Sequence, residues 1–549
     1  MEIYDLSFDP RDPLYDVPGL PGVRWGLQIF TTCNLYGLDA DKTSITVDNS
    51  GLRLVSEGLS WAGQQQRSEG RVEAQVTQEG GAWVWRIHAQ HAEPLKVVKL
   101  MFWGLPDAAL SQGWWQAVSP KDEVYQPTLT TPLRLRYPWP EWLTPWACAG
   151  QTDGSPFVCV SMRDTEVRAK RLYVHLPPYA DGKPVVELNF EEDATKWRGE
   201  ITTSEMRLRI CHSKAEVDTD FEDHLRALTQ AYGIPEWETR PDVPDWMRDI
   251  RLVLNLHGQH WTGYVFNTFD QMAETLRFVT QYIPGKHILA YIPGWEGRYY
   301  YAYPWYRPGE AMGGDAGFRR LVATAKELNV HLMPMFGMHG ANIQVYPDWE
   351  RSAFRSRTNS YVKLVNFPDW DTDRFGEDDQ VFLNPGEPTF RQHLLEQVSA
   401  VVRDYDVPGV FLDTSACWFN DPNYNEYEGY KLLLAELRQR HPDLLIAGEG
   451  WWDALLAILP VNQSWLGVGR QFRYPQLLTR YARALGHLRE GAPGPVSTGV
   501  HERGFTYLPM PSPSAGHIPS IGIVDDTLEK YRDELIKACQ AVVESWSNG

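Results

Sequence analysis

Two acidic residues of the chain, Asp413 and Glu449, each follow a short apolar run. The run at 409–412 ends directly on Asp413, and the run at 444–447 is separated from Glu449 by one glycine. Such runs are typical of buried parallel strands, and the apolar spacing within 426–440 predicts the helix that joins them. Neighbouring parallel strands lie about 5 Å apart and end on the same face of a barrel. The spacing therefore predicts a pair of carboxyl groups that could act together on a glycosidic bond.

The chemistry of such a pair gives each carboxyl group a role. Asp413 would attack the anomeric carbon as a nucleophile and form a covalent glycosyl-enzyme. Glu449 would act as general acid and base, because the neighbouring indoles of Trp451 and Trp452 form an apolar wall that favours a protonated carboxyl group. The alternatives are a capping role for Asp413 and a structural ion pair for Glu449.

An aromatic loop follows the second predicted strand of the same region. It contains Trp295, Glu296 and Arg298 and continues into a Tyr-rich run at 299–306. Aromatic rings offer flat apolar surfaces to the C–H faces of sugars. Glu296 and Arg298 could bind hydroxyl groups, and Arg298 could also bind an anionic substituent. The alternative is a loop that packs on itself.

Histidines recur near the predicted strand ends, at His257, His260, His339 and His501. A metal site is one interpretation, but His257-Gly-Gln-His260 lacks the His-x-His spacing of metal-dependent amidohydrolases, and no His-Glu-x-x-His occurs. We therefore expect hydrogen bonds to sugar hydroxyls or structural roles, and neither a metal nor another cofactor. The predicted substrate-binding residues are Trp295, Glu296, Arg298, His257, His339, Trp418, Trp451, Arg470, His501 and Glu502.

The composition narrows the classes of partner. The 549 residues carry 52 Lys and Arg against 71 Asp and Glu, and this net charge of −19 argues against nucleic acid and anionic membranes. The 23 Trp and 26 Tyr suit carbohydrate contacts as well as core packing. No apolar stretch approaches the roughly 20 residues of a membrane span, and the first residues do not resemble a signal peptide. The six scattered cysteines favour reduced thiols. We expect a cytoplasmic protein and leave a homo-oligomer open.

The rhythm of the sequence changes along the chain. Residues 1–212 alternate apolar and polar residues in short segments separated by turns, which predicts an N-terminal β-sandwich. Residues 213–248 indicate a helix and a Pro-rich connector. Residues 249–549 alternate strands and helices and are predicted to form a catalytic (β/α)8 TIM barrel. The expected fold class is thus multidomain, β followed by α/β.

The barrel prediction specifies its elements. The predicted strands are Leu252–Leu256, His287–Ile292, His331–Phe336, Gly409–Leu412, Leu444–Ala447, Leu466–Phe472, Pro495–Val500 and Ile518–Val524. The predicted helices are Phe269–Tyr282, Gly317–Leu328, Thr389–Tyr405, Glu426–Arg440, Gln476–Leu488 and Thr527–Trp546. The connection from 340 to 388 is long for a βα loop, and it predicts a lid, an inserted subdomain or an oligomer contact.

The order of these elements resembles barrel glycoside hydrolases that retain the α configuration. In the α-amylase-like and the endo-α-N-acetylgalactosaminidase-like families, an Asp ends strand four and a Glu ends strand five, as Asp413 and Glu449 would here. An N-terminal β-sandwich resembles the second type more closely, and the resemblance implies the roles of nucleophile and acid/base. Phe411 stands where amylases carry an Arg, which argues against starch-type substrates.

We therefore expect a glycoside hydrolase that cleaves an α-linked glycoside or oligosaccharide by retaining double displacement. One rival is a carbohydrate-binding barrel without catalysis, and another is a metal-dependent hydrolase that uses the strand-end histidines. The sequence leaves the sugar, its linkage and exo or endo action open.

Overall fold

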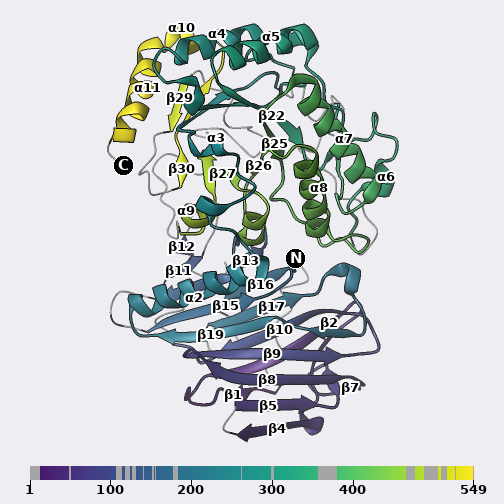
Figure 1. Cartoon of the computed structure of the whole chain (residues 1–549). Coiled ribbons are helices and arrows are strands. Elements are labelled where there is room, and N and C mark those ends of the chain that lie inside the picture. Colours follow the sequence, from purple (N-terminus) through teal and green to yellow (C-terminus); the bar gives the residue numbers. More distant parts are fainter. Residues whose placement is uncertain are drawn as a thin grey trace. The chain divides into compact units, whose positions relative to one another are not determined.

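The computed structural model divides the chain into two compact units, Met1–Gly233 and Ile234–Gly549 (Figure 1). The division falls inside the predicted connector at 213–248. The structure describes residues 13–48, 51–106, 114–117, 124–125, 132–139, 141–150, 154, 156–176, 184–260, 263–297, 302–356, 380–464, 476–486, 505–508, 516–525 and 527–547.

The N-terminal unit consists of two antiparallel sheets and one helix. The first sheet has the order β13-β16-β17-β10-β2-β3-β6-β7, with β1 beside β2. Its strands are β1 (Tyr15–Asp16), β2 (Arg24–Thr31), β3 (Leu35–Leu38), β6 (Leu59–Trp61), β7 (Gln66–Ser68), β10 (Leu95–Trp103), β13 (Leu133–Tyr137), β16 (Lys170–His175) and β17 (Val185–Glu191). The second sheet has the order β12-β11-β14-β15-β19-β9-β8-β5-β4, with β18 beside β9. Its strands are β4 (Thr43–Asp48), β5 (Gly51–Ser56), β8 (Arg71–Glu79), β9 (Ala82–Gln90), β11 (Trp114–Ala117), β12 (Val124–Tyr125), β14 (Trp146–Gly150), β15 (Phe157–Arg163), β18 (Glu200–Thr202) and β19 (Glu205–Cys211).

Large aromatic side chains join the two sheets. Trp85 of β9 lies 6.0 Å from Trp25 of β2 and 5.0 Å from Phe102 of β10, measured between ring centroids. All three side chains are buried. Helix α2 (Lys214–Tyr232) is tied to the second sheet because the indole N–H of Trp146 donates to Asp220 at 2.9 Å. The predicted β-sandwich is confirmed.

The C-terminal unit contains a nearly closed ring of parallel strands in the order β31-β20-β21-β22-β25-β26-β27-β28-β30. These strands are β20 (Leu252–Leu256), β21 (Ile288–Ile292), β22 (His331–Gly337), β25 (Gly409–Asp413), β26 (Leu445–Glu449), β27 (Val461–Ser464), β28 (Arg483–Gly486), β30 (His517–Ile518) and β31 (Ser520–Ile523). Only Pro519 separates β30 from β31, so these two strands share the eighth position. Antiparallel β29 (Phe505–Leu508) pairs with β31. The predicted (β/α)8 TIM barrel is confirmed.

Helices lie around this ring (Figure 1). They are α4 (Phe269–Val279), α5 (Gly314–Glu327), α7 (Pro388–Tyr405), α8 (Glu426–Arg440), α9 (Gln476–Tyr481), α10 (Thr527–Lys530) and α11 (Arg532–Ser547). Local sequence starts several of them: Thr268 and Gln271 form a capping box at α4, and the Asn425 side chain accepts from Glu428 N–H at α8. After β26 the structure has a short 3₁₀ helix, η9 (Asp453–Ala457), in place of an α-helix.

The predictions for strands six and seven were wrong. Strand six is β27 at Val461–Ser464, which precedes the predicted range 466–472. Strand seven is β28 at Arg483–Gly486, inside the segment that was predicted to be one helix from 476 to 488. The ranges 466–472 and 495–500 lie outside the described residues.

The long connection after β22 contains a small two-stranded sheet. Strand β23 (Gly340–Asn342) pairs with antiparallel β24 (Gln380–Phe382), and α6 (Trp349–Ser352) lies between them in the chain. The structure therefore gives part of this connection regular structure of its own.

The segment that leads into the barrel is held against it by hydrogen bonds of Arg240, whose side chain is fully buried. Its Nη1 donates to the carbonyl oxygens of Leu456 and Tyr481 at 2.6 and 2.7 Å. Its Nε lies 2.8 Å from Asp242, which also pairs with Arg438 of α8 at 3.2 Å. Two charged residues of the connector thus contribute to the packing of the C-terminal unit. Within the described part of the chain, no helix is both long and apolar enough to cross a membrane.

Candidate active site

Asp413 and Glu449 end two adjacent strands of the ring. Leu412 of β25 is the register partner of Gly448 of β26, so the two acidic residues follow a matched pair on neighbouring strands. Asp413 is 8% exposed, and Glu449 is partly buried. The carboxyl ends of barrel strands form the face that carries active sites in this fold. The structure thus places both residues where the sequence predicted them.

The Cys417 thiol lies within electrostatic reach of both carboxyl groups. Burial raises the pKa of this thiol well above its usual value, and the negative charges of Glu449, Glu426 and Asp413 raise it further. A charge acts on a pKa over a short range in a protein. Asp413 and Glu449 therefore share one local environment.

The backbone after Asp413 holds Glu449 in position. Thr414 has a φ of 60°, which is uncommon for a residue with a branched side chain. Its N–H donates to Oε2 of Glu449 at 2.9 Å. The hydroxyl of Ser415 and the N–H of Ala416 both donate to the Glu449 carbonyl oxygen, at 3.1 and 3.0 Å. Three consecutive residues of the loop after β25 thus form hydrogen bonds with Glu449 at the end of β26.

A third carboxyl group, that of Glu296, acts on a tyrosine that the charge of Asp413 also reaches. Glu296 is 9% exposed, and burial raises its pKa to about 8, although the Tyr303 hydroxyl opposes this shift. Burial also raises the pKa of Tyr306, and the charges of Glu296 and Asp413 add to that effect. Tyr306 therefore links Glu296, after β21, to Asp413, at the end of β25, and the three residues form one electrostatically coupled cluster. At neutral pH the raised pKa favours a protonated Glu296 that can donate a hydrogen bond.

Gly337, at the end of β22, brings two tyrosines to this cluster. It is the register partner of Asp413. A Cβ atom at Gly337 would come within 2.2 Å of the Tyr303 ring, so only glycine leaves room for that ring. The Tyr306 hydroxyl donates to the Gly337 carbonyl oxygen at 2.9 Å. These tyrosines were not among the predicted site residues, although both lie in the Tyr-rich run that the sequence indicated.

His257 lies just past the end of β20 and is fully buried. Burial lowers its pKa to about 3, with a smaller effect from His260, so the ring is neutral near pH 7. The Asn267 side-chain amide donates to the carbonyl oxygens of His257 and Ile523, at 2.8 and 2.9 Å. Asn267 therefore fixes His257 and joins the first and last strand positions of the ring.

His339 belongs to a buried polar cluster. Its Nδ1 lies 3.0 Å from the Leu383 carbonyl oxygen, and its Nε2 contacts the Tyr430 hydroxyl and lies 3.2 Å from Glu426 Oε1. Both ring nitrogens thus have protein partners, and the side chain has no exposure. This placement favours the structural alternative for His339 over the predicted sugar contact.

The predicted aromatic contacts divide into buried and accessible rings. Trp295 is fully buried, donates its indole N–H to the Met335 carbonyl oxygen at 2.7 Å and lies 5.0 Å from the Phe318 ring. Trp451 is 2% exposed. Packing is therefore the role that the structure favours for both. Trp418 is only partly buried, although its indole nitrogen is itself buried and has no acceptor among the described residues. It is the better candidate for a sugar contact.

Four predicted binding residues lie outside the described part of the chain: Arg298, Arg470, His501 and Glu502. One strand-end residue was missed. Gln463 of β27 is the register partner of Glu449 and is 4% exposed. Placing strand six correctly at 461–464 would have identified it.

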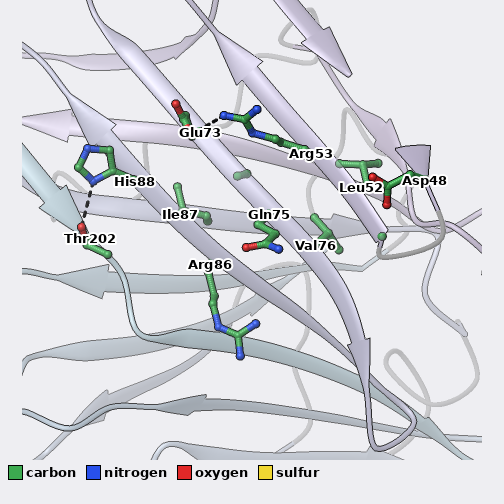
Figure 2. A pocket seen from close by; sticks show the side chains of 12 residues that line it. Asp48, Leu52, Arg53, Glu73, Gln75, Val76, Arg86, Ile87, His88 and Thr202 are labelled. Atoms are coloured by element: carbon green, nitrogen blue, oxygen red, sulfur yellow. Dashed lines mark hydrogen bonds and ion pairs between the residues drawn. The ribbon is translucent and has the colours of Figure 1, made fainter. Parts of the chain in front are cut away.

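Two hollows are lined by other residues. One, of about 380 Å³, lies on the second sheet of the sandwich, where Arg53, Glu73, Arg86 and His88 line it (Figure 2). Its charges are already matched, since Arg53 lies 3.1 Å from Glu73. The other, of about 970 Å³, lies at the amino ends of barrel strands and is lined in part by His331. That face of a barrel serves stability.

In the described ranges, no group of three or more His, Cys, Asp or Glu residues could hold a metal ion.

Solved structures share this fold. The chain matches an α-N-acetylgalactosaminidase from Bifidobacterium bifidum without ligand, with a TM-score of 0.66, 12% identity, and coverage of 97% of this chain and 92% of that chain. The same enzyme in its GalNAc complex matches with a TM-score of 0.63 and 12% identity, over 88% of this chain and 83% of that chain. A GH36 α-galactosidase variant from Geobacillus stearothermophilus, in complex with stachyose, matches with a TM-score of 0.50 and 12% identity, over 96% of this chain and 73% of that chain.

No family model matches the sequence, and no curated protein matches it either. At 12% identity the structural likeness shows the fold alone. That fold, a β-sandwich followed by a barrel, agrees with the resemblance drawn from the two strand-end motifs: the chain has the architecture of TIM-barrel α-glycosidases.

Proposed function

We propose that the protein is a glycoside hydrolase that cleaves an α-linked glycoside with retention, with Asp413 as nucleophile and Glu449 as general acid and base. The observation that carries this proposal is the placement of both carboxyl groups on adjacent strand ends, with Glu449 held by the Thr414 N–H at 2.9 Å. Adjacent strands lie about 4.8 Å apart. Strand ends at this spacing allow the carboxyl separation of about 5–5.5 Å that retaining enzymes use, whereas inverting enzymes need roughly 6.5–9.5 Å.

The reaction would take two steps. Asp413 attacks the anomeric carbon while Glu449 gives its proton to the leaving oxygen, which yields a covalent glycosyl-enzyme and the free aglycone. Glu449, now a carboxylate, then takes a proton from a water molecule that attacks the same carbon. The sugar leaves, and Asp413 is regenerated as a carboxylate.

The surrounding residues suggest how the sugar would be held. Among the described contacts, the partly exposed ring of Trp418 can pack against a sugar, whereas the polar atoms of Glu296 and His257 are buried. Arg298, Arg470, His501 and Glu502 remain proposed contacts from the sequence. The names of the similar structures make α-linked N-acetylgalactosamine and galactose the first sugars to screen.

A screen of nitrophenyl α- and β-glycosides tests the proposal, with NMR of the anomer first released from any hit. We expect hydrolysis of an α-glycoside with release of the α-anomer. Asp413→Asn should remove this activity, whereas Asp443→Asn, an exposed residue that precedes β26, serves as the matched control and should retain it. Release of the β-anomer would rule out retention, and normal turnover by Asp413→Asn would rule out the nucleophile.

A carbohydrate-binding barrel without catalysis is distinguished by chemical rescue. Azide can replace a missing carboxylate nucleophile and yield a glycosyl azide from an activated substrate. We expect azide to restore turnover to Asp413→Gly and to leave Asp443→Gly unaffected. The absence of both wild-type turnover and rescue would favour the binding protein.

A further inference from the structure

Trp305 is an exposed indole in the loop that follows β21. It is 44% exposed, and Val345, which follows β22 in the chain, is 39% exposed beside it. The indole N–H of Trp305 donates to the Val345 carbonyl oxygen at 3.2 Å. Single exposed apolar residues are common on protein surfaces, but this ring is also held in place by the structure around it.

The Trp305 ring is held by more than one contact. The imidazole of His393 meets it edge-on, with the ring centroids 4.5 Å apart and the planes at 84°. His393 is itself fixed, since its Nε2 lies 3.0 Å from the Pro304 carbonyl oxygen. A side chain that is fixed beforehand loses little conformational entropy when a ligand binds. The indole is therefore preorganised as a flat apolar surface.

The loop that carries Trp305 is pinned beside Asp413. Tyr303 packs on Gly337, and the Tyr306 hydroxyl bonds to the Gly337 carbonyl oxygen at 2.9 Å. Gly337 is the register partner of Asp413. The Cα atoms of Trp305 and Tyr306 are about 3.8 Å apart. Trp305 and the proposed nucleophile thus lie within the span of a short oligosaccharide.

The exposed face of Trp305 is large enough to receive one small ring. A large aromatic side chain buries at most about 250 Å², so Trp305 at 44% exposure presents on the order of 100 Å². Gln344 and Asp348, close to Val345 in the sequence, are exposed polar residues.

We propose that Trp305 forms a remote subsite that stacks against the apolar face of a pyranose ring, one or more sugars away from the scissile bond. The proposal rests on the proposed function and adds a substrate class to it: oligosaccharides that extend beyond the terminal α-linked sugar. Loss of this stacking contact should weaken binding up to roughly tenfold.

The kinetic test compares two substrates with the same terminal sugar, the nitrophenyl α-glycoside that the screen identifies and a tetrasaccharide that ends in that sugar. Trp61, on the sandwich, is 43% exposed and provides the matched control. For the tetrasaccharide, we expect Trp305→Ala to raise KM about tenfold at similar kcat, Trp305→Phe to restore most of the loss, and Trp61→Ala to change nothing. A loss for Trp305→Ala that is equal on both substrates, or absent on both, would overturn the subsite.

A binding test separates the subsite from catalysis. Stachyose and the blood-group A tetrasaccharide, which end in α-linked galactose and N-acetylgalactosamine, are titrated by calorimetry into the Asp413→Asn protein with and without Trp305→Ala. Weaker binding with Trp305→Ala supports the subsite even if the wild type turns over no glycoside, which would count against the proposed function alone. Binding that is unchanged by Trp305→Ala, or undetectable at millimolar sugar, overturns the subsite. A change in sedimentation with Trp305→Ala would also overturn it and assign Trp305 to a contact between copies.

Discussion

The backbone N–H of Thr414 donates a 2.9 Å hydrogen bond to Oε2 of Glu449, so the residue that follows one proposed catalytic group holds the other. The N–H points there because Thr414 has a φ of 60°. A residue with a Cβ atom accepts this conformation at a cost of about 1–3 kcal/mol. The ends of β25 and β26 are thus connected by this hydrogen bond as well as by the pairing of the two strands.

Substitutions at Thr414 test this coupling. Proline cannot adopt a positive φ and has no N–H, so Thr414→Pro should lower kcat at least a hundredfold. Glycine adopts φ near 60° readily and keeps the N–H, so Thr414→Gly should stay within a fewfold of wild type. Steady-state kinetics and circular dichroism measure both. Loss of activity in the folded glycine variant would show that the Thr414 side chain, and not its N–H, matters.

Glu449 as the proton donor predicts a dependence on the leaving group. Glu449→Gln should reduce kcat/KM by several orders of magnitude for an alkyl glycoside, whose leaving oxygen needs a proton. The loss should be much smaller for a dinitrophenyl glycoside, whose aryl oxide leaves without one, until hydrolysis of the glycosyl-enzyme limits turnover. Burst kinetics on the two substrates checks this. An equal loss on both would contradict the assignment.

Glu296 should make stability depend on pH in a defined direction. Its pKa is about 8 in the folded protein against an ordinary 4.5, so between these values the unfolded chain has released a proton that the folded protein still holds. Its contribution to stability is complete below pH 4.5 and is lost as pH rises through 8. Urea unfolding at pH 5 and pH 8 should therefore show a decline that is smaller in Glu296→Gln. A decline of the same size in both proteins would contradict the raised pKa.

Gly337→Ala should damage the site through packing. The added Cβ would lie 2.2 Å from the Tyr303 ring, and a clash with a buried ring typically costs about 1–3 kcal/mol. We expect lower thermal stability and reduced activity, because Tyr303 and Tyr306 lose their fixed positions. Gly409→Ala, on the next strand, is the matched control, since its Cβ would meet only ordinary contacts at 3.5 Å. A larger loss in Gly409→Ala would contradict this account.

The sequence predicted the centre of the barrel well because β25 and β26 are continuous apolar runs with a clear amphipathic helix between them. It failed at β27, since Val461-Asn462-Gln463-Ser464 has only one apolar residue. It also failed at β28, because Leu477, Leu478, Tyr481 and Leu485 are spaced like one helix face, and β28 begins within that pattern. β27 and β28 form strands because they are buried and complete the barrel. A short stretch of sequence shows neither of these conditions.

The side chains of the site were harder to predict than its backbone. Both Trp295 and Trp418 follow predicted strands, but the Trp295 side chain is fully buried in the core and the Trp418 side chain stays partly exposed. His339 likewise lies near a strand end, yet Glu426 and Tyr430, which are 87 and 91 residues further along the chain, contact its ring. Sequence spacing indicates which face of the barrel a residue reaches, whereas tertiary neighbours decide whether it meets solvent.

The buried Arg240 has a practical consequence for expressing the barrel alone. A fragment that starts at the predicted boundary, residue 249, would expose the carbonyl oxygens of Leu456 and Tyr481 and leave Arg438 without Asp242. Starting at Ile234 keeps these partners together and discards only the sandwich with its helix. The shorter fragment is the one to avoid when barrel function is assayed in isolation.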